Sequence, residues 1–186
     1  ESVSRLITSK TRAIITVALY GLSPDMDPLV KLANSKSIFV LEDNAECFLG
    51  YYKDRLVGTL GHASSFSFQS SKHLTSGEGG IVLIRDLDLA DKVRRIQSLG
   101  YAGVSAKSSK ISKADIQHPS YSRHVSMGWN YRMPELCAAV ALAQVERISE
   151  LVSIRIQAAN LLLEVFSRYS RIFVPQYTPP YCVNSY

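Results

Sequence analysis

A strand–helix–strand pattern in the first forty-three residues constrains the fold of this chain most strongly. Residues 13–17, AIITV, form a short apolar run rich in β-branched residues, typical of a strand covered on both faces. In the stretch 23–36, Ser23 is a candidate N-cap, Pro24 suits the first helical position, and apolar residues recur at helical spacing. Residues 37–43, SIFVLED, form a second apolar run. Two strands joined by one helix predict a right-handed βαβ unit, and hence an α/β fold with a mostly parallel sheet and flanking helices.

The rest of the chain extends this sheet and then becomes helical. Polarity alternates over residues 51–61 around Lys53 and Asp54, which predicts a small hairpin. Strands are expected at 63–68 and 79–86, and the connection between them is too short for a helical crossover, so the second strand should run antiparallel. Three further segments are predicted: a helix at 87–98 ending at Gly100, a long polar loop at 101–127, and one bent helix or two helices broken near Ser149 over 133–169.

Composition limits the class of protein. With 46% apolar residues among 186, the chain has enough apolar surface for one core, or for one domain and the start of another. Three cysteines without CxxC spacing argue against a disulfide framework and a zinc site, and we expect no metal. We find no secretory signal and no apolar run of membrane-spanning length, so a cytoplasmic protein without a membrane partner is expected. The net charge of +5 comes from scattered basic residues, which favours a small anionic substrate over nucleic acid.

Charged and polar residues follow two of the predicted strands. Asp43 ends the run 37–43, whereas Ser67, Gln69 and Lys72 end or follow the run 63–68. The carboxyl ends of parallel strands meet at one edge of a sheet, where ligands bind. Taken singly, Asp43 is compatible with a helix N-cap and Lys72 with a surface lysine. Taken together, these residues place an amine, a carboxylate and hydroxyls in one crevice.

This combination of groups suits pyridoxal 5′-phosphate. A lysine in a partly desolvated pocket attacks a carbonyl to form a Schiff base. The cofactor needs such a lysine for its aldehyde, a carboxylate for its pyridine nitrogen, and hydroxyls or backbone N–H groups for its phosphate. Lys72, Asp43 and Ser67 supply one group for each need. The glycines at 77, 79 and 80 predict a turn with positive φ and do not match a nucleotide-binding loop.

Three motifs carry a resemblance to a known family. In order along the chain, FVLEDNAE, SFSFQSSKHLTSGEGG and NYRMPELCAA resemble the DegT/StrS family of sugar aminotransferases, and the resemblance extends to about Tyr169. It implies a pyridoxal-phosphate enzyme of the aspartate-aminotransferase fold that transfers an amino group from an amino acid, glutamate or glutamine, to a nucleotide-linked or related keto-sugar. It also implies that residues 1–130 are part of the large cofactor-binding domain, 131–172 are connecting helices, and 173–186 begin an incomplete small domain.

The resemblance also assigns roles to individual residues. Lys72 is expected to bind the cofactor covalently and to move protons, Asp43 to pair with the pyridine nitrogen, and Ser67 to bind the phosphate. Glu46 falls beside the phenolic oxygen of the ring, where the family more often has glutamine or histidine. We expect Glu46 to be protonated, to turn toward substrate, or to mark a subfamily. Gln69 occupies a cofactor-binding position often held by histidine.

Asn130 matches an asparagine that reaches the cofactor phosphate of a neighbouring subunit, which implies a homodimer with shared active sites. His62 stands where the family usually has aspartate, and we expect it to be a hydrogen-bonded turn residue. The stretches EDNAECFL and GHASSFSFQSSKH resemble most closely the branch that aminates an eight-carbon keto-sugar acid of the octulosonate type.

Two other functions remain open at this point. Dehydratases of the same fold usually replace the lysine with histidine, and here Lys72 is followed directly by His73. A regulatory or sensor protein is the second alternative, because it would keep the fold, the lysine and the cofactor without turnover.

Overall fold

The computed structural model describes residues 1–103, 113–169, 171 and 178–185. It divides into one unit made of Glu1–Leu83 with Glu135–Tyr186 and a second made of Ile84–Pro134. Each unit is described by itself. The predicted division into 1–130, 131–172 and 173–186 stays a prediction.

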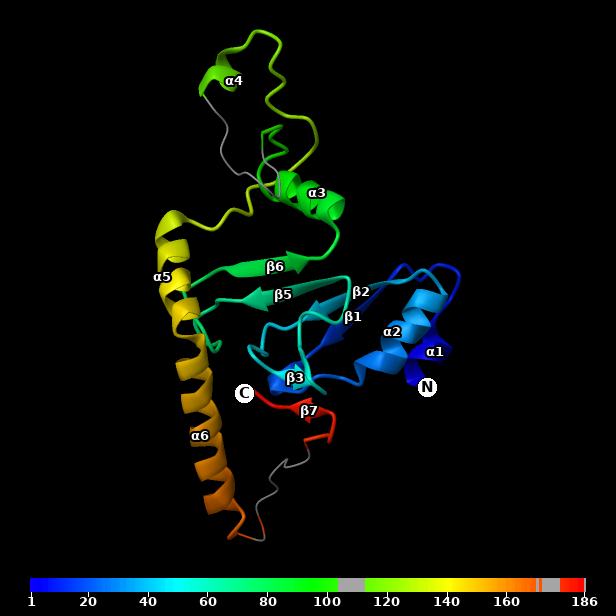
Figure 1. The fold of residues 1–186 in the computed structure, drawn as a ribbon, viewed down its shortest axis with the longest axis vertical. Coiled ribbons are helices and arrows are strands. Elements are labelled where there is room, and N and C mark those ends of the chain that lie inside the picture. Colours follow the sequence, from blue (N-terminus) through cyan, green and yellow to red (C-terminus); the bar gives the residue numbers. More distant parts are fainter. Residues whose placement is uncertain (104–112, 170, 172–177, 186) are drawn as a thin grey trace. The chain divides into compact units, whose positions relative to one another are not determined.

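A four-stranded sheet lies at the centre of the first unit, with the strands in the order β1-β2-β5-β6 (Figure 1). Strands β1 (Ala13–Val17), β2 (Phe39–Asp43) and β5 (Ala63–Ser67) are parallel, which confirms the predicted βαβ unit. The arrow of β6 (Gly80–Ile84) points the opposite way in Figure 1, as the short connection from β5 predicts. The fold is therefore α/β with a mainly parallel sheet.

Helix α2 (Met26–Ser35) connects β1 to β2, and its start differs from the prediction. The N-cap is Asp25, so Ser23 and Pro24 precede the helix. Tertiary contacts explain the shift. The Ser23 N–H donates to Cys182 Sγ at 3.2 Å, and the Tyr52 hydroxyl donates to Asp25 Oδ1 at 2.5 Å and accepts the Asp27 N–H at 3.1 Å. These contacts fix the chain before Met26, and no local pattern reveals them.

The core of this unit lies between α2 and the sheet. Its buried members include Met26, Ala33, Val40, Tyr52 and Leu60. Each large apolar side chain buried in this way contributes roughly 1.5–3 kcal/mol to folding.

The expected cover on both faces of β1 is not present within the described residues. Ile15 and Val17 are 63% and 51% exposed, whereas Thr16 on the opposite face is buried. One face of β1 therefore packs in the core and the other is open.

Short elements complete the first unit. Helix α1 (Ser2–Leu6) precedes β1, and the turn η1 (Leu19–Gly21) follows it. Strands β3 (Tyr51–Tyr52) and β4 (Arg55–Leu56) form the predicted hairpin. Strand β7 (Cys182–Val183) pairs with the other edge of β3.

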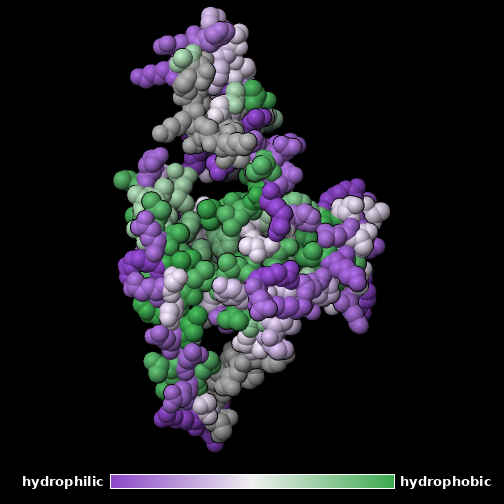
Figure 2. Space-filling view, in the orientation of Figure 1, coloured by the Kyte–Doolittle hydropathy of each residue, from purple (hydrophilic) through white to green (hydrophobic). Residues whose placement is uncertain are grey.

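Helices α5 (Glu135–Glu146) and α6 (Ile148–Phe166) occupy the predicted helical stretch, with a break at Arg147 close to the predicted one. Both carry exposed apolar side chains, among them Leu136, Leu142 and Leu161, and hydrophobic residues are visible along them in Figure 2. No helix in the described part of the chain is long and apolar enough to cross a membrane.

The second unit contains α3 (Leu87–Gln97) and α4 (Lys113–Gln117). Asp86 caps α3 by accepting the Leu89 N–H at 2.7 Å. At the other end the first left-handed residue is Leu99, with φ 59°, and the predicted Gly100 follows it with φ 73°. A Cβ at Gly100 would lie 1.9 Å from the Ser126 carbonyl oxygen, which explains the glycine. Helix α4 lies in the predicted loop 101–127, of which residues 104–112 are outside the described part.

Candidate active site

The carboxyl ends of β1, β2 and β5 form one edge of the sheet. Val17 is paired with Asp43, and Asp43 with Ser65, so β1 and β2 end at the same level and β5 extends two residues further. Side chains alternate between the two faces of a strand, and Ser67 is two residues beyond Ser65. Asp43, Ser65 and Ser67 therefore share one face, which is the face that exposes Ile15 and Val17.

The two predicted cofactor ligands at the strand ends are partly held by their own loops. Asp43 Oδ1 accepts the Ala45 N–H at 3.1 Å, and Ser67 Oγ accepts the Gln69 N–H at 3.2 Å. Both residues are partly exposed. These contacts orient a carboxylate and a hydroxyl at the edge and leave part of each side chain accessible to a ligand.

Lys72 lies in the loop that follows β5, and its ammonium contacts an acid. Its Nζ lies 2.9 Å from Glu46 Oε1, and the two side chains are only 20% and 21% exposed. Glu46 comes from the loop after β2, and its Oε2 accepts the Tyr20 N–H at 3.1 Å from the loop after β1. The hydrogen bond from Lys72, aided by the Tyr20 N–H, lowers the pKa of Glu46. Glu46 is therefore a carboxylate in the cofactor-free chain, and the expectations for Glu46 beside the cofactor stay predictions.

The side chains just before Lys72 contact one another. Gln69 Nε2 donates to Ser70 Oγ at 2.9 Å, and Gln69 Oε1 accepts from the Ser71 N–H and hydroxyl at 2.8 and 2.6 Å. The Lys72 N–H donates to the Gln69 carbonyl at 3.0 Å, which closes a tight turn. In the cofactor-free chain, Gln69 thus stabilises the turn that carries Lys72.

The glycine-rich turn after Lys72 has the predicted backbone. Gly77 and Gly79 have φ values of 85° and 146°, which side chains other than glycine rarely adopt. The Phe68 N–H donates to the Gly79 carbonyl at 2.9 Å, so the turn leads directly from β5 into β6.

Asn130 belongs to the second unit. Its Oδ1 accepts from Arg132 Nε at 2.9 Å, and its backbone forms a bridge with Ser98. The predicted contact of Asn130 with a neighbouring subunit stays a prediction.

Glu42, which precedes Asp43 in β2, has a structural role that its place in the sequence did not identify. It is 2% exposed, and its two carboxylate oxygens accept the N–H groups of Gly58, Leu60 and Gly61 at 2.6–2.7 Å. Strand alternation was the available signal, because Glu42 shares the buried face with Val40 whereas Asp43 does not. Glu42 therefore holds the 58–61 loop, and Asp43 faces the candidate site.

Two histidines, one before and one after β5, have structural contacts. His62 Nδ1 accepts the Val40 N–H at 3.0 Å, and its ring stacks on Phe39, which confirms the expected hydrogen-bonded turn residue. His73 is 6% exposed, and its Nε2–H donates to the Ser185 carbonyl at 2.8 Å. Burial lowers the pKa of His73. His73 is therefore a buried contact to residues 178–185, on the inner side of the loop that presents Lys72.

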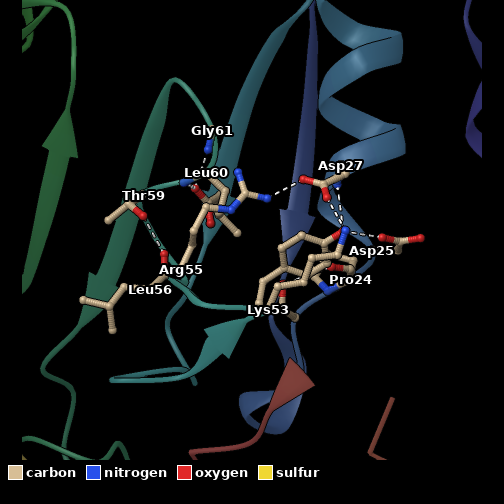
Figure 3. Close-up of polar contacts among 12 residues, drawn as sticks. Pro24, Asp25, Asp27, Lys53, Arg55, Leu56, Thr59, Leu60 and Gly61 are labelled. Atoms are coloured by element: carbon tan, nitrogen blue, oxygen red, sulfur yellow. Dashed lines mark hydrogen bonds and ion pairs between the residues drawn. The ribbon is translucent and has the colours of Figure 1, made fainter. Parts of the chain in front are cut away.

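A surface pocket of about 360 Å³ lies away from these residues, between α2 and the β3–β4 hairpin. Its lining includes Asp27, Lys31, Asn34 and Arg55. Figure 3 shows Asp27 between Lys53 and Arg55, with which it forms ion pairs. The Asp27 side chain is 44% exposed and both basic side chains are 51% exposed, so these pairs add little stability. We attribute no chemistry to this pocket.

Solved structures with the same fold define the class of protein. An aminotransferase from Psychrobacter cryohalolentis superimposes with a TM-score of 0.77 at 31% identity, covering 90% of this chain and 42% of that one. The Escherichia coli GDP-4-keto-6-deoxy-D-mannose-3-dehydratase, solved with bound hydrated pyridoxal phosphate, gives a TM-score of 0.79 at 25% identity, covering 95% and 46%. The fold is that of pyridoxal-phosphate-dependent aminotransferases and their relatives.

The family follows from the sequence match. Residues 1–180 match the model of the DegT/DnrJ/EryC1/StrS aminotransferase family, and the chain belongs to that family. The GDP-perosamine synthase of Escherichia coli O157:H7 is 39% identical over 161 residues, which is 87% of this chain and 40% of the relative. The chain thus spans less than half the length of the relatives that it matches.

Proposed function

We propose that the protein containing this chain is a pyridoxal-phosphate-dependent aminotransferase that transfers an amino group from an amino acid to a keto-sugar. The observation that carries the proposal is the position of Lys72. It lies on the loop after β5, at the edge where Asp43 and Ser67 end their strands, and the family match covers all three residues. Glutamate or glutamine is the proposed donor.

The side chains at this edge fit the cofactor by their chemistry. Asp43 and Ser67 share a face of the sheet, so a carboxylate and a hydroxyl are available on the same side for a pyridinium nitrogen and a phosphate. Lys72 is mostly covered but reachable, as a carbonyl-binding amine requires. Gln69 and Glu46 are proposed to contact the cofactor from the adjacent loops. When bound, the cofactor supplies an electron sink that stabilises negative charge at the substrate carbon.

Lys72 has a second proposed role, which is to carry the proton that transamination moves. The Lys72 Nζ lies at the end of a flexible side chain, so once it is free as an amine it can take a proton from the substrate carbon and give it to another carbon nearby. Asp43, fixed by the Ala45 N–H, is proposed to keep the pyridine nitrogen protonated by its negative charge.

The structure favours an aminotransferase over a dehydratase of the same fold. The dehydratase alternative would need histidine at the position of the catalytic lysine. Here Lys72 contacts Glu46 at the sheet edge, whereas His73 is buried against the Ser185 carbonyl. Because the neighbouring histidine points into the protein, it is not available as the base in place of Lys72.

The identity of the sugar is proposed at the level of a class. The relative at 39% identity is named for a GDP-linked sugar, which supports a nucleotide-linked keto-sugar as substrate. A keto-sugar acid of the octulosonate type remains the alternative from the EDNAECFL and GHASSFSFQSSKH stretches. A homodimer that shares its sites through Asn130, and a cytoplasmic location, complete the proposal.

The covalent role of Lys72 is tested on the full-length protein. Borohydride reduction in the presence of pyridoxal phosphate should add the cofactor to the peptide that contains Lys72, and Lys72→Ala should abolish both the adduct and turnover. Adduct formation at another lysine would overturn the assignment. A sensor is distinguished by absorbance: an aminotransferase changes spectrum with glutamate and returns with a keto-sugar, whereas a sensor does not cycle with any donor.

A further inference from the structure

One hydrogen-bonded chain of groups connects the loops that follow all three parallel strands. The Tyr20 N–H, after β1, donates to Glu46 Oε2 at 3.1 Å, and Glu46 Oε1, after β2, accepts from Lys72 Nζ, after β5, at 2.9 Å. Each contact joins residues that are 26 positions apart in sequence. Such contacts require the complete parallel sheet and do not form within any one loop.

The backbone at Tyr20 supports a specific purpose for this chain of contacts. Tyr20 has φ 51° and ψ 39°, a left-handed conformation that is unfavourable for a residue with a side chain. Strained backbone of this kind persists only where the surrounding structure enforces it, and it is concentrated at functional sites. Here the strained residue is the one whose N–H meets Glu46.

The acids near Lys72 differ in what they contact. Glu42 accepts N–H groups of the 58–61 loop, and Asp43 accepts the Ala45 N–H in its own turn. Glu46 is the acid whose carboxylate meets the ammonium, and its pKa is lowered first by Lys72 and then by the Tyr20 N–H. His73, which is buried and hydrogen-bonded to Ser185, also contributes to the electrostatic environment of Glu46.

We propose that Glu46 is a positioning residue for Lys72: its charge, fixed from behind by the Tyr20 backbone, holds the lysine ammonium at the carboxyl edge of the sheet before a cofactor binds. This inference rests on the proposed function, because holding Lys72 at the edge matters only if Lys72 binds the cofactor. The side chains of Lys72 and Glu46 are each about one-fifth exposed, so water weakens their ion pair only in part. The contact with the carboxylate occupies the lysine nitrogen, so a carbonyl partner must displace Glu46 before it can react with Lys72.

The experiment compares acetylation of Lys72 by acetic anhydride at pH 8 in the cofactor-free, full-length protein, measured by peptide mass spectrometry. Glu46→Gln keeps the size and most hydrogen bonds but removes the charge, whereas Glu46→Asp keeps the charge. The matched control is Glu78→Gln, which removes the charge of an exposed acid on the loop that carries Lys72. Tyr20→Gly keeps the N–H and tolerates the left-handed backbone.

We expect Glu46→Gln to raise the acetylation rate of Lys72 about two- to fivefold, the effect of losing one partly covered ion pair. Glu78→Gln and Tyr20→Gly should stay within a factor of about 1.5 of the wild type, well under that effect. The acetylation rate of Lys72 in Glu46→Asp should lie between those of the wild type and Glu46→Gln. Equal rates in Glu46→Gln and Glu78→Gln would overturn the inference, and so would an equal rise in Glu46→Gln and Glu46→Asp, since that result indicates packing and not charge.

The same samples separate this inference from the proposed function. Borohydride reduction with pyridoxal phosphate reports whether Lys72 is the cofactor lysine, independently of the acetylation result. If the adduct forms at Lys72 but Glu46→Gln acetylates like Glu78→Gln, the positioning role fails and the proposed function stands. If no adduct forms at Lys72, the proposed function fails, and with it the purpose assigned to the ion pair.

Discussion

Replacement of Glu42 by glutamine tests how the protein holds the 58–61 loop. Glu42 Oε1 accepts the N–H groups of Leu60 and Gly61 at 2.7 and 2.6 Å, and Oε2 accepts that of Gly58 at 2.7 Å. A glutamine has one oxygen and one NH₂ group. Its best orientation keeps the oxygen on Leu60 and Gly61, and it then places NH₂ against the Gly58 N–H. Two donors face each other in a site where the side chain is 2% exposed.

The size of the expected destabilisation follows from these three hydrogen bonds. Leaving the Gly58 N–H without an acceptor costs about 1–3 kcal/mol, and the two remaining bonds each lose about 1 kcal/mol when the acceptor becomes neutral. A neutral amide is easier to bury than a carboxylate, which offsets part of this loss. We expect Glu42→Gln to lower the free energy of unfolding by about 2–3 kcal/mol, a large value for an isosteric change.

Equilibrium urea unfolding of the full-length protein at pH 7 measures this change. With a slope of about 2 kcal/mol per molar urea, the midpoint should fall by about 1–1.5 M. Glu78→Gln is the control, since it makes the same chemical change at an exposed position, and its midpoint should stay unchanged. If both variants unfold at the same urea concentration, the three N–H contacts of Glu42 do not stabilise the fold and the reasoning fails.

Three further predictions concern the site and its surroundings. Asp43→Asn should reduce the rate of transamination by at least about 100-fold in steady-state assays, because the amide cannot hold the pyridine nitrogen protonated, and near-normal rates would remove Asp43 from that role. Gly61→Ala should destabilise the protein by about 1–3 kcal/mol in urea unfolding, since the new Cβ would lie 2.9 Å from the Val40 carbonyl oxygen; an unchanged midpoint would show that the loop moves freely. Burial raises the pKa of the Cys47 thiol to about 11, whereas the unfolded thiol ionises near 9. The thiol thus favours the folded state fully below pH 9 and progressively less up to pH 11, so between pH 8 and 10.5 the wild type should lose about 2 kcal/mol more than Cys47→Ala, and equal losses would contradict the buried thiol.

The parallel sheet was predictable because its signals are local. The runs 13–17 and 37–43 are apolar and flank one helical segment, and chain connectivity then leaves only a right-handed βαβ unit. The start of α2 was not predictable from Ser23 and Pro24. Its position depends on Cys182, which is 159 residues from Ser23, and on the hydroxyl of Tyr52. Local capping rules identify candidate caps, but tertiary contacts select among them.

The residue types of the candidate site were predictable from the sequence, but the contacts between their side chains were not. Lys72, Asp43 and Ser67 follow from residue type and from their places after strands. The separation of Glu42 from Asp43 follows from alternation, since adjacent residues of a strand face opposite sides. The partner of Lys72 follows from neither rule, because two loops without regular structure bring Glu46 and Lys72 together.

The contact between Glu46 and Lys72 also bears on the interpretation of the acid at position 46. The sequence left three interpretations: a protonated carboxyl, a group turned toward substrate, or a subfamily mark. A carboxyl that accepts from an ammonium and from a backbone N–H has a lowered pKa, so Glu46 is charged before a cofactor binds, and the three interpretations of the cofactor-bound site stay predictions. Glutamine or histidine at position 46 would accept a hydrogen bond from Lys72 without offering a full negative charge. Glu46 therefore offers Lys72 a full negative charge, and the comparison of Glu46→Gln with Glu46→Asp measures the effect of that charge directly.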